Sequence, residues 1–329
     1  MHIIIDPGRA RRSINMTDNI VYDTVTDLNG APLELKLSIC AQDGNSEMRL
    51  ALGRDDEPPL APMPCLVWIP GGGWRGSDKN LMVPEMTFLA DNGYVLASLY
   101  YRSSAQGHWP DQLADVKTAI RFLRANAAQY NIDPERIGVL GRSAGGQLAA
   151  SAAMNLPNGQ GSAWSGFSDT VQAACDLFGP VDLPALIAAD RVAIQEPSHR
   201  WHTMSETHAG ALLGCSDDEL EQRGRDASPA YHINSDMCPL LILHGDKDKL
   251  VPCSISEDFY RRIVDAGLED RAELVILKDA GHGTREFFQP ETKQRILTFF
   301  DKHLKGANNH GRTSDHSNQA GGQCGGGGA

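Results

Sequence analysis

One stretch constrains the fold of this chain more than any other: residues 137–146 read Ile-Gly-Val-Leu-Gly-Arg-Ser-Ala-Gly-Gly. A short apolar run breaks there into small residues, and a helix-forming pattern follows over 147–154. We therefore predict a strand, a sharp turn and a helix in direct succession. The spacing Gly141-x-Ser143-x-Gly145 is typical of a turn that exposes a serine hydroxyl at the edge of a sheet, because glycines on both sides let strand and helix approach closely.

The rest of the chain alternates short apolar runs with longer amphipathic ones. We predict further strands at 65–69, 94–100, 171–177, 239–243 and 272–277, and helices at 83–92, from Pro110 onward, at 255–266 and at 290–304. Two earlier runs, 21–26 and 33–39, flank Asn29-Gly30 and indicate an antiparallel hairpin. Strands separated by helices imply right-handed crossovers, so the expected fold class is α/β, with a mostly parallel sheet covered on both faces.

The segments outside this alternation define the expected domain organisation. We predict one domain over 20–306, preceded by an extension without periodicity at 1–19. Residues 43–64 are rich in proline and charge and are expected to form an exposed connection. A long insertion at 184–227 is expected to lie over the carboxyl edge of the sheet and shape a pocket. The tail 307–329 is rich in Asn, Ser, His and Gly and is expected to be disordered.

Composition excludes several classes of partner. Asp and Glu number 42 against 30 Lys and Arg, and the resulting formal charge of −12 repels phosphate backbones, so we expect no nucleic-acid partner. No apolar run approaches the roughly 20 residues that span a bilayer, so we expect no membrane insertion.

The N-terminal apolar run Ile3-Ile4-Ile5 is followed at once by Asp6-Pro7. This run is too short for a signal peptide, so we predict a cytoplasmic location. The seven cysteines are scattered and expected to be reduced. A homodimer is compatible with the sequence.

A serine becomes a nucleophile only with a base within hydrogen-bond reach, and that base needs a carboxylate to orient it. Where the serine comes first, the expected chain order is serine, acid, histidine. His310 and His316 lie in the tail, and His303 lies in the last predicted helix. His282 instead follows a predicted strand and lies between glycines that leave room for its ring, so we predict that it is the base.

The acid is less well defined by the residues alone. Asp246 and Asp248 both follow the predicted strand 239–243, and Asp182 follows the strand before it. All three would lie at the carboxyl edge of the sheet, and an aspartate there could equally cap a turn. Spacing alone does not choose between Asp246 and Asp248.

A glycine-rich loop supplies candidate donors for an oxyanion. Pro70 to Trp74 reads Pro-Gly-Gly-Gly-Trp and directly follows the first buried strand. We predict that the backbone N–H groups of Gly72, Gly73 and Ala144 form an oxyanion hole, because glycines allow the backbone to pass close to the serine. The loop lacks the Gly-Lys-Ser/Thr ending of a phosphate-binding loop.

The chain resembles the serine carboxylesterases of the α/β-hydrolase superfamily, in the branch of hormone-sensitive-lipase-like esterases and acetyl-esterase and BD-FAE domains. The resemblance runs from about Tyr22 to Leu304. The motifs that carry it are Pro70-Gly71-Gly72-Gly73-Trp74, Tyr100-Tyr101-Arg102, Trp109-Pro110-Asp111-Gln112 with Asp115 beyond it, Asp133-Pro134-Glu135-Arg136-Ile137, Gly141-Arg142-Ser143-Ala144-Gly145-Gly146, Phe178-Gly179-Pro180-Val181-Asp182-Leu183, Ser228-Pro229, His244-Gly245-Asp246-Lys247-Asp248-Lys249-Leu250-Val251-Pro252 and Ala280-Gly281-His282. Because the acid ends that family's H-G-x-x-D pattern, the resemblance favours Asp248.

The resemblance implies a carboxylic ester hydrolase that needs no metal or organic cofactor. It predicts a triad of Ser143, Asp248 and His282 acting on small-molecule esters with short acyl chains. Trp74 and Arg142 are the predicted substrate contacts. Two departures from the family pattern are Pro70, where a histidine is usual, and Arg142, where the family often has Asp, His or Glu.

Three other interpretations remain open from the sequence. The same chemistry could cleave amides, as in a peptidase or a formamidase, and a hydrolase fold can also persist as a non-catalytic binding protein. His199, His202, Glu206 and His208 lie close in sequence and could bind a metal, although polar surface residues are the simpler interpretation. Five apolar residues are candidates either for an acyl pocket or for core packing: Trp164, Trp201, Met204, Leu212 and Leu213.

Overall fold

A computed structural model describes residues 2–4, 12–42, 60–76, 78–157 and 163–306. The tail predicted at 307–329 and most of the connection predicted at 43–64 lie outside the described residues. Within them the chain builds one sheet with the strand order β1-β2-β4-β3-β5-β6-β7-β8. Its strands are β1 Ile14–Thr26, β2 Pro32–Gln42, β3 Met63–Ile69, β4 Val95–Leu99, β5 Ile132–Arg142, β6 Ala173–Leu177, β7 Leu240–Gly245 and β8 Ala272–Leu277.

The sheet has an antiparallel start and a parallel remainder. β1 pairs with β2 and β2 with β4 in the antiparallel sense, and every later pair is parallel. The predicted hairpin and the predicted mostly parallel sheet are therefore confirmed. One boundary is corrected: β1 begins at Ile14, inside the segment 1–19 that was expected to lack regular structure. Its first residues are held by pairing with β2, for example Ile14 opposite Gln42, which no local sequence pattern reveals.

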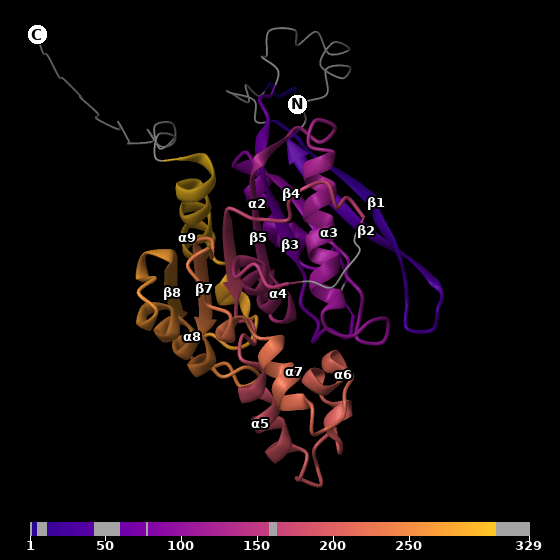
Figure 1. Ribbon diagram of the computed structural model, residues 1–329. Helices are drawn as coiled ribbons and strands as arrows, with labels where there is room; N and C mark the ends of the chain where they lie inside the picture. The colour runs from indigo at the N-terminus through magenta and orange to yellow at the C-terminus, as the bar shows by residue number, and fades with distance from the viewer. Residues whose placement is uncertain (1, 5–11, 43–59, 77, 158–162, 307–329) are drawn as a thin grey trace, which may run out of the picture.

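Helices cover both faces of this sheet, as Figure 1 shows. They are α2 Val83–Asp91, α3 Asp111–Ala125, α4 Ala144–Ala153, α5 Leu183–Ala193, α6 His208–Leu213, α7 Leu220–Asp226, α8 Cys253–Asp265 and α9 Pro290–Phe300, the last continued by a π-turn at Asp301–Lys305. Side chains from α3, α4 and α8 belong to one buried cluster, and those from α2 and α9 belong to the other. No helix within the described residues is long and apolar enough to cross a membrane.

The strand β3, in the middle of the sheet, is apolar throughout because both of its faces are buried. In β3 the side chains of Cys65, Val67 and Ile69 join the cluster under α3 and α4. Leu66 and Trp68 join the cluster on the opposite face. This alternation with a period of two residues makes β3 fully buried and explains why its sequence shows no polar position.

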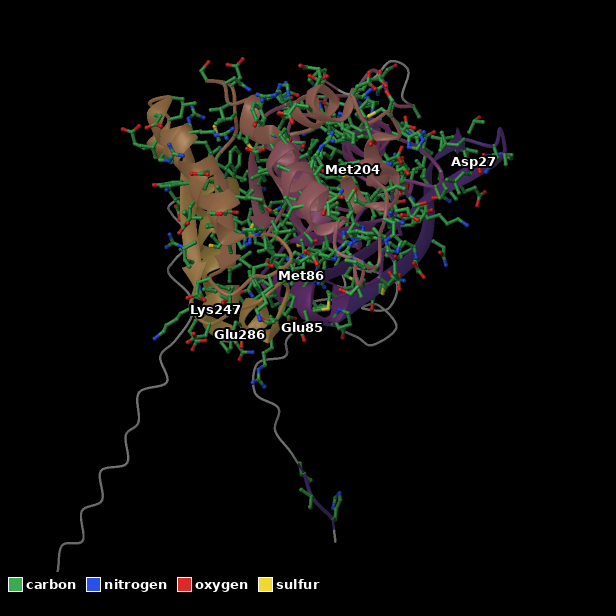
Figure 2. The ribbon with its side chains drawn as sticks, turned by 90° about the horizontal axis from the view of Figure 1, so that it is seen from below. Asp27, Glu85, Met86, Met204, Lys247 and Glu286 are labelled. Carbon is green, nitrogen blue, oxygen red and sulfur yellow. The ribbon has the colours of Figure 1, made fainter. Side chains whose placement is uncertain are left out.

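The stretch 183–226 forms a separate helical layer at one end of the sheet, below the strands in Figure 1. It contains α5, α6, α7 and a 3₁₀ turn at Met204–Glu206. Figure 2 looks at this layer from below and labels Met204 within it, whereas Asp27 marks the tip of the β1–β2 hairpin at the side of the molecule. Met204 is buried in the larger core cluster, so the layer packs onto the domain.

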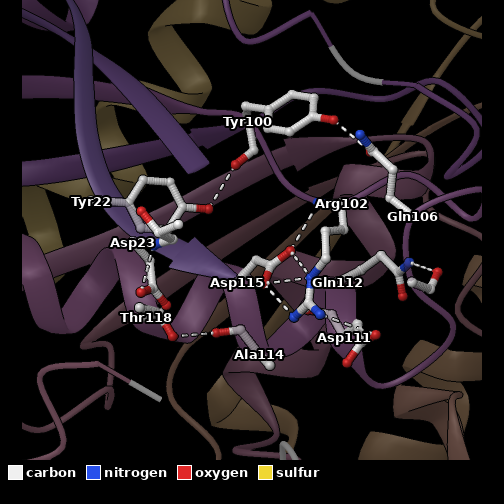
Figure 3. Close-up of polar contacts among 12 residues, drawn as sticks. Tyr22, Asp23, Tyr100, Arg102, Gln106, Asp111, Gln112, Ala114, Asp115 and Thr118 are labelled. Carbon is white, nitrogen blue, oxygen red and sulfur yellow. Dashed lines mark hydrogen bonds and ion pairs between the residues drawn. The ribbon is translucent and has the colours of Figure 1, made fainter. Parts of the chain in front are cut away.

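A buried ion pair fixes the loop that follows β4. The guanidinium of Arg102 binds Asp115 on α3 through Nη2 at 2.7 Å and Nε at 3.0 Å, and the Arg102 backbone N–H donates to the same carboxylate at 2.8 Å. Figure 3 shows this pair beside Tyr22, whose hydroxyl donates to the Tyr100 carbonyl at 2.7 Å. Burial raises the pKa of Asp115 to about 6, although Arg102 acts to lower it. Tyr101, held between these anchors, donates its hydroxyl to the Pro70 carbonyl at 2.8 Å.

Close backbone contact at the start of α4 generates our first prediction. A Cβ atom at Gly145 would lie 2.0 Å from the Ile69 carbonyl oxygen and 2.7 Å from that of Pro70, and neither can move without disturbing β3. We expect Gly145→Ala to lower the free energy of unfolding by about 1–3 kcal/mol or more, as overpacking does in rigid sites. Chemical denaturation measures this. Gly76→Ala is the control, because no atom lies within 4 Å of a Cβ at Gly76. Equal stability of the two variants would contradict the prediction.

Candidate active site

The serine lies on a strained turn between β5 and α4. Ser143 has φ 53° and ψ −122°, a positive φ that is uncommon for a residue with a side chain. Its N–H donates to the Leu177 carbonyl of the neighbouring strand at 2.8 Å, and its carbonyl accepts from Gln147 at 3.1 Å. The helix therefore begins at Ala144, ahead of the helix-forming pattern at 147–154. A Cβ at Gly141 would lie only 2.1 Å from the Gly145 carbonyl oxygen, so position 141 requires glycine, as position 145 does because of the Ile69 carbonyl.

The structure brings Ser143, His282 and Asp248 into one hydrogen-bonded chain. His282 Nε2 lies 2.8 Å from Ser143 Oγ, and its Nδ1 lies 2.7 Å from Asp248 Oδ2. A carboxylate only accepts, so Nδ1 carries the proton and Nε2 is free to accept the serine hydroxyl. The His282 side chain is 17% exposed, and that of Asp248 is fully buried. This arrangement suits proton transfer between serine and histidine with the acid shielded from water.

Asp248 is held as a carboxylate by the donors around it. Its Oδ1 accepts from the N–H groups of Leu250 at 2.8 Å and Val251 at 2.9 Å. Burial by itself would raise the pKa of Asp248, but bonds from His244, His282 and the Val251 N–H hold that pKa well below its ordinary value. Asp248 therefore stays charged at neutral pH.

The other two candidate acids have separate partners. Asp246 Oδ1 accepts from the Asp279 N–H at 2.7 Å and so fixes the loop that carries His282. Asp182 caps α5 by accepting from Ala185 at 3.1 Å and pairs with Arg262 at 2.9 Å. Spacing left Asp246 and Asp248 open and the family resemblance favoured Asp248; the structure places Asp248 against the histidine.

The glycine-rich loop passes directly beside the serine. A Cβ at Gly71 would lie 3.1 Å from the Ser143 Cβ, and Gly72 and Gly73 have φ values of 141° and 59°, which favour glycine. Pro70 has no N–H to donate, but its carbonyl is held by Tyr101. Gly73 and Ala144 line the same cavity as Ser143. The predicted oxyanion donors therefore come from the two segments that flank the hydroxyl.

The cavity at Ser143 is formed partly by the helical layer 183–226. Its lining residues are Gly73, Trp74, Ser143, Ala144, Pro180, Leu186, Asp190, Trp201, His208, Leu250 and Val251. Of the apolar candidates from the sequence, Trp201 lines the cavity, whereas Met204, Leu212 and Leu213 belong to the core. Trp164 is 39% exposed and contacts Phe122 edge-on with ring centroids 5.4 Å apart.

The two predicted substrate contacts have different surroundings. Trp74 lines the cavity and donates its indole N–H to Gln147 at 3.2 Å. The guanidinium of Arg142 instead lies 5.7 Å from the centre of the Phe178 ring, and a Cβ at Gly283 would meet its Nη2 at 2.7 Å. Arg142 is not among the residues that line the cavity. The Phe178 ring also contacts His282 edge-on, with ring centroids 4.8 Å apart, so Phe178 lies against both Arg142 and His282.

Sequence reasoning missed three residues around the site. Phe178, which directly follows β6, packs against His282. His208 lies against Gly73, and His244 contacts Asp248. Burial lowers the pKa of His208 to about 4, with Arg75 and Arg200 acting in the same direction, so this cavity residue is neutral at pH 7. Phe178 and His244 stand in quoted motifs, but nothing in those motifs says which neighbour each side chain contacts.

The four residues considered for a metal site serve other contacts. The Glu206 carboxylate accepts from the backbone N–H groups of His202 at 2.8 Å and Thr203 at 2.9 Å, which caps the 3₁₀ turn. His199 Nδ1 lies 3.1 Å from the Trp201 carbonyl. Within the described part of the chain, no group of three His, Cys, Asp or Glu side chains is placed to hold a metal ion.

The fold and the arrangement around Ser143 define an α/β-hydrolase. A solved structure described as a truncated form of a carbohydrate esterase from gut microbiota superposes with a TM-score of 0.71 at 25% identity, covering 91% of this chain and 99% of that one. The family model BD-FAE matches residues 56–263, well over half of the chain. The chain therefore belongs to the BD-FAE family.

Two relatives come from Mycobacterium tuberculosis. The probable carboxylic ester hydrolase LipM is 33% identical over 211 residues, which cover 60% of this chain and 44% of that protein. The esterase LipC is 30% identical over 237 residues, which cover 71% of this chain and 56% of that protein. The chain thus spans about half the length of the curated relatives it matches.

A buried carboxyl group behind the serine turn generates a pH prediction. Asp176 on β6 is fully buried and accepts from the Gly179 N–H at 2.8 Å, and its Oδ2 has no hydrogen-bond partner among the described residues. Burial raises its pKa to about 7, although the Gly179 N–H and His244 act to lower it. Because the folded pKa exceeds the unfolded value of 3.8, the folded state binds the extra proton between these pH values, and stability falls as pH rises from about 4 to about 7.

We therefore expect Asp176→Asn, which does not titrate, to gain stability relative to the wild type as pH rises. Thermal unfolding of both proteins at pH 5 and pH 8 measures this: the difference in Tm should favour the variant more at pH 8. A Tm difference that is the same at both pH values would show that Asp176 does not titrate in this range.

Proposed function

We propose that this protein is a serine hydrolase that cleaves carboxylic esters of small molecules with short acyl chains. The observation that carries the proposal is the hydrogen-bonded chain from Ser143 through His282 to Asp248, which opens into a cavity. Membership of the BD-FAE family and the similarity to LipM and LipC support it. A lone serine turn would be weaker support, because fold alone does not determine chemistry.

In the proposed mechanism Ser143 Oγ attacks the ester carbonyl carbon while His282 Nε2 takes its proton. Asp248 keeps the imidazole in the reactive tautomer and stabilises the imidazolium. The tetrahedral intermediate collapses as His282 gives its proton to the leaving alcohol oxygen, which leaves an acyl group on Ser143. Water, deprotonated by His282, then attacks the acyl carbon; as the bond from that carbon to Ser143 Oγ breaks, His282 returns the proton to Oγ and the acid is released. No step requires a metal or an organic cofactor.

The negative oxygen of the intermediate would be bound by the backbone N–H groups of Gly72, Gly73 and Ala144. Gly73 and Ala144 lie on the cavity wall beside Ser143, and the N-terminus of α4 adds its positive dipole end. Removing one such donor usually costs on the order of 10²-fold to 10³-fold in rate. Trp74 is proposed as a wall against the substrate, and Arg142 as a contact that supports the His282 side of the site.

The cavity favours an acyl group of modest size. Trp74, Pro180, Leu186 and Trp201 provide apolar walls, and they stand close to the serine. The predicted cytoplasmic location rests on the sequence alone. An amide substrate is the alternative within the same chemistry, and faster cleavage of an anilide than of the matched ester would favour it.

The direct test is hydrolysis of p-nitrophenyl esters from acetate to decanoate by the purified protein and by Ser143→Ala. We expect activity to fall steeply with chain length in the wild type. The variant should lose activity by on the order of 10⁴-fold or more, because it has no nucleophile. Equal rates in the two proteins would show that Ser143 is not the nucleophile. No hydrolysis by the wild type would exclude these esters as substrates.

The neighbouring aspartates provide a matched pair of variants. Asp248→Asn should lower kcat by about 10⁴-fold, because an amide can present N–H to Nδ1 and select the wrong tautomer of His282. Asp246→Asn keeps an acceptor for the Asp279 N–H, so its kcat should stay within about tenfold of the wild type. Steady-state kinetics with p-nitrophenyl acetate distinguishes them. A larger loss at Asp246 than at Asp248 would reverse the assignment of the acid.

A further inference from the structure

A second, fully buried imidazole contacts the same carboxylate oxygen as His282. His244 is 0% exposed, and its Nε2 lies 3.3 Å from Asp248 Oδ2 and 2.9 Å from the Val251 carbonyl oxygen. Its Nδ1 lies 2.7 Å from the hydroxyl of Ser256 on α8. The sequence placed His244 just after a strand that ended at residue 243. In the structure it belongs to β7 and pairs opposite Ile276 of β8, so its backbone is part of the sheet.

The partners of His244 determine where its proton lies. The Val251 carbonyl can only accept, so Nε2 must carry the hydrogen, and this N–H is shared between Val251 and Asp248. Nδ1 is then an acceptor, and the Ser256 hydroxyl can donate to it. All ring contacts are thus satisfied by a neutral imidazole, which removes the need for a second buried charge.

These bonds close a small ring around the loop that carries the acid. The Val251 N–H donates to Asp248 Oδ1, while the Val251 carbonyl accepts from His244, which also reaches Asp248 Oδ2. This closed set of contacts therefore links β7 to the loop that carries Asp248. The bond from His244 to Ser256 adds the first turn of α8. Leu250 and Val251 also line the cavity at Ser143, so the same contacts fix part of its wall.

We propose that His244 is a positioning residue for the reaction. It holds the Asp248 carboxylate within hydrogen-bond distance of His282 and reduces the negative charge that Asp248 presents to the His282 imidazole. The inference rests on the proposed function, but the arrangement is defined by contacts that exist without substrate. Asp248 is the shared acceptor of two imidazole N–H groups, the close one from His282 at 2.7 Å and the longer one from His244 at 3.3 Å. Removing the longer bond leaves Asp248 with more charge to direct at His282.

The charged and titratable groups around His244 come from three elements. Asp176 lies on β6 and interacts electrostatically with it, Asp248 lies in the following loop with His282 beyond, and Cys253 begins α8 and interacts with Asp248. Asp176→Asn is therefore a necessary companion variant. If Asp176→Asn shows the same change in pH dependence as His244→Phe, that change comes from Asp176.

The decisive comparison is between His244→Phe and His244→Gln in the full-length protein. Phe places an aromatic ring without nitrogen atoms at this position, whereas the Gln side-chain amide can still donate from near the Nε2 position. We expect His244→Phe to lower kcat on p-nitrophenyl acetate by about 10-fold to 100-fold with little change in KM, as misplacement of a reacting group does. The acid limb of its kcat/KM profile should move to higher pH, because Asp248 then retains the proton on His282 more strongly. His244→Gln should recover most of kcat and the original acid limb.

Controls separate positioning from stability. Thr118→Val removes a buried hydroxyl from α3 that donates to the Ala114 carbonyl of its own helix at 2.8 Å, and it should lower Tm without moving the pH profile. Equal losses in His244→Phe and His244→Gln with an unchanged acid limb would reduce His244 to a structural role, and wild-type kinetics in His244→Phe would overturn the proposal outright.

A measurement without substrate keeps this test independent of the proposed function. We expect the proton between His282 Nδ1 and Asp248 to give a strongly downfield NMR signal, which should shift in His244→Phe and return in His244→Gln. A wild-type protein that hydrolyses no ester but shows this shift would refute the proposed function and leave the positioning role standing. An unshifted signal in an active enzyme would refute the positioning role alone.

Discussion

The site depends on one close backbone approach, the packing of the glycines around Ser143 at the junction of β5 and α4. A side chain at Gly141 would meet the Gly145 carbonyl, and a side chain at Gly145 would meet the carbonyl of Ile69 on β3. These contacts hold Ser143 at a positive φ, a conformation that costs about 1–3 kcal/mol and persists only where the surroundings over-determine it. The strain is local, and the buried parallel strands on both sides supply the stability that maintains it.

Each functional group is attached to the end of a different strand. Ser143 follows β5, Phe178 follows β6, Asp248 follows β7 and His282 follows β8. Parallel strands bring their carboxyl ends to one edge, so groups separated by more than 100 positions in the chain meet within hydrogen-bond distance there. The loop after β3 reaches the same edge and is fixed from behind by Tyr101, which the Arg102–Asp115 ion pair anchors. The reactive edge and the buried core are thus parts of one arrangement.

Sequence alone predicted the features that have a local chemical signature. Strand, turn and helix around Ser143 follow from glycine spacing, and the α/β class follows from the alternation of apolar runs. The meeting of Ser143 with His282 could be expected from chain order, but Asp246 and Asp248 could not be separated by spacing, because both follow β7 and both make loop contacts. The start of β1 at Ile14 was missed because its pairing partner lies at the far end of β2. The contact of the Arg142 guanidinium with the Phe178 ring joins the end of β5 to the segment after β6 and has no pattern in the sequence.

The same distinction explains why His244 was overlooked. A histidine in an apolar strand is most simply a satisfied core residue, and His244 is indeed satisfied by Ser256 and Val251. What changes its interpretation is geometry across three elements, because Val251 also donates to Asp248 and the ring nitrogen reaches the oxygen that His282 uses. An acid held by its own loop alone could shift whenever that loop moved. Since His244 belongs to a paired strand, Asp248 takes its position from the sheet, and the sheet is also what positions Ser143.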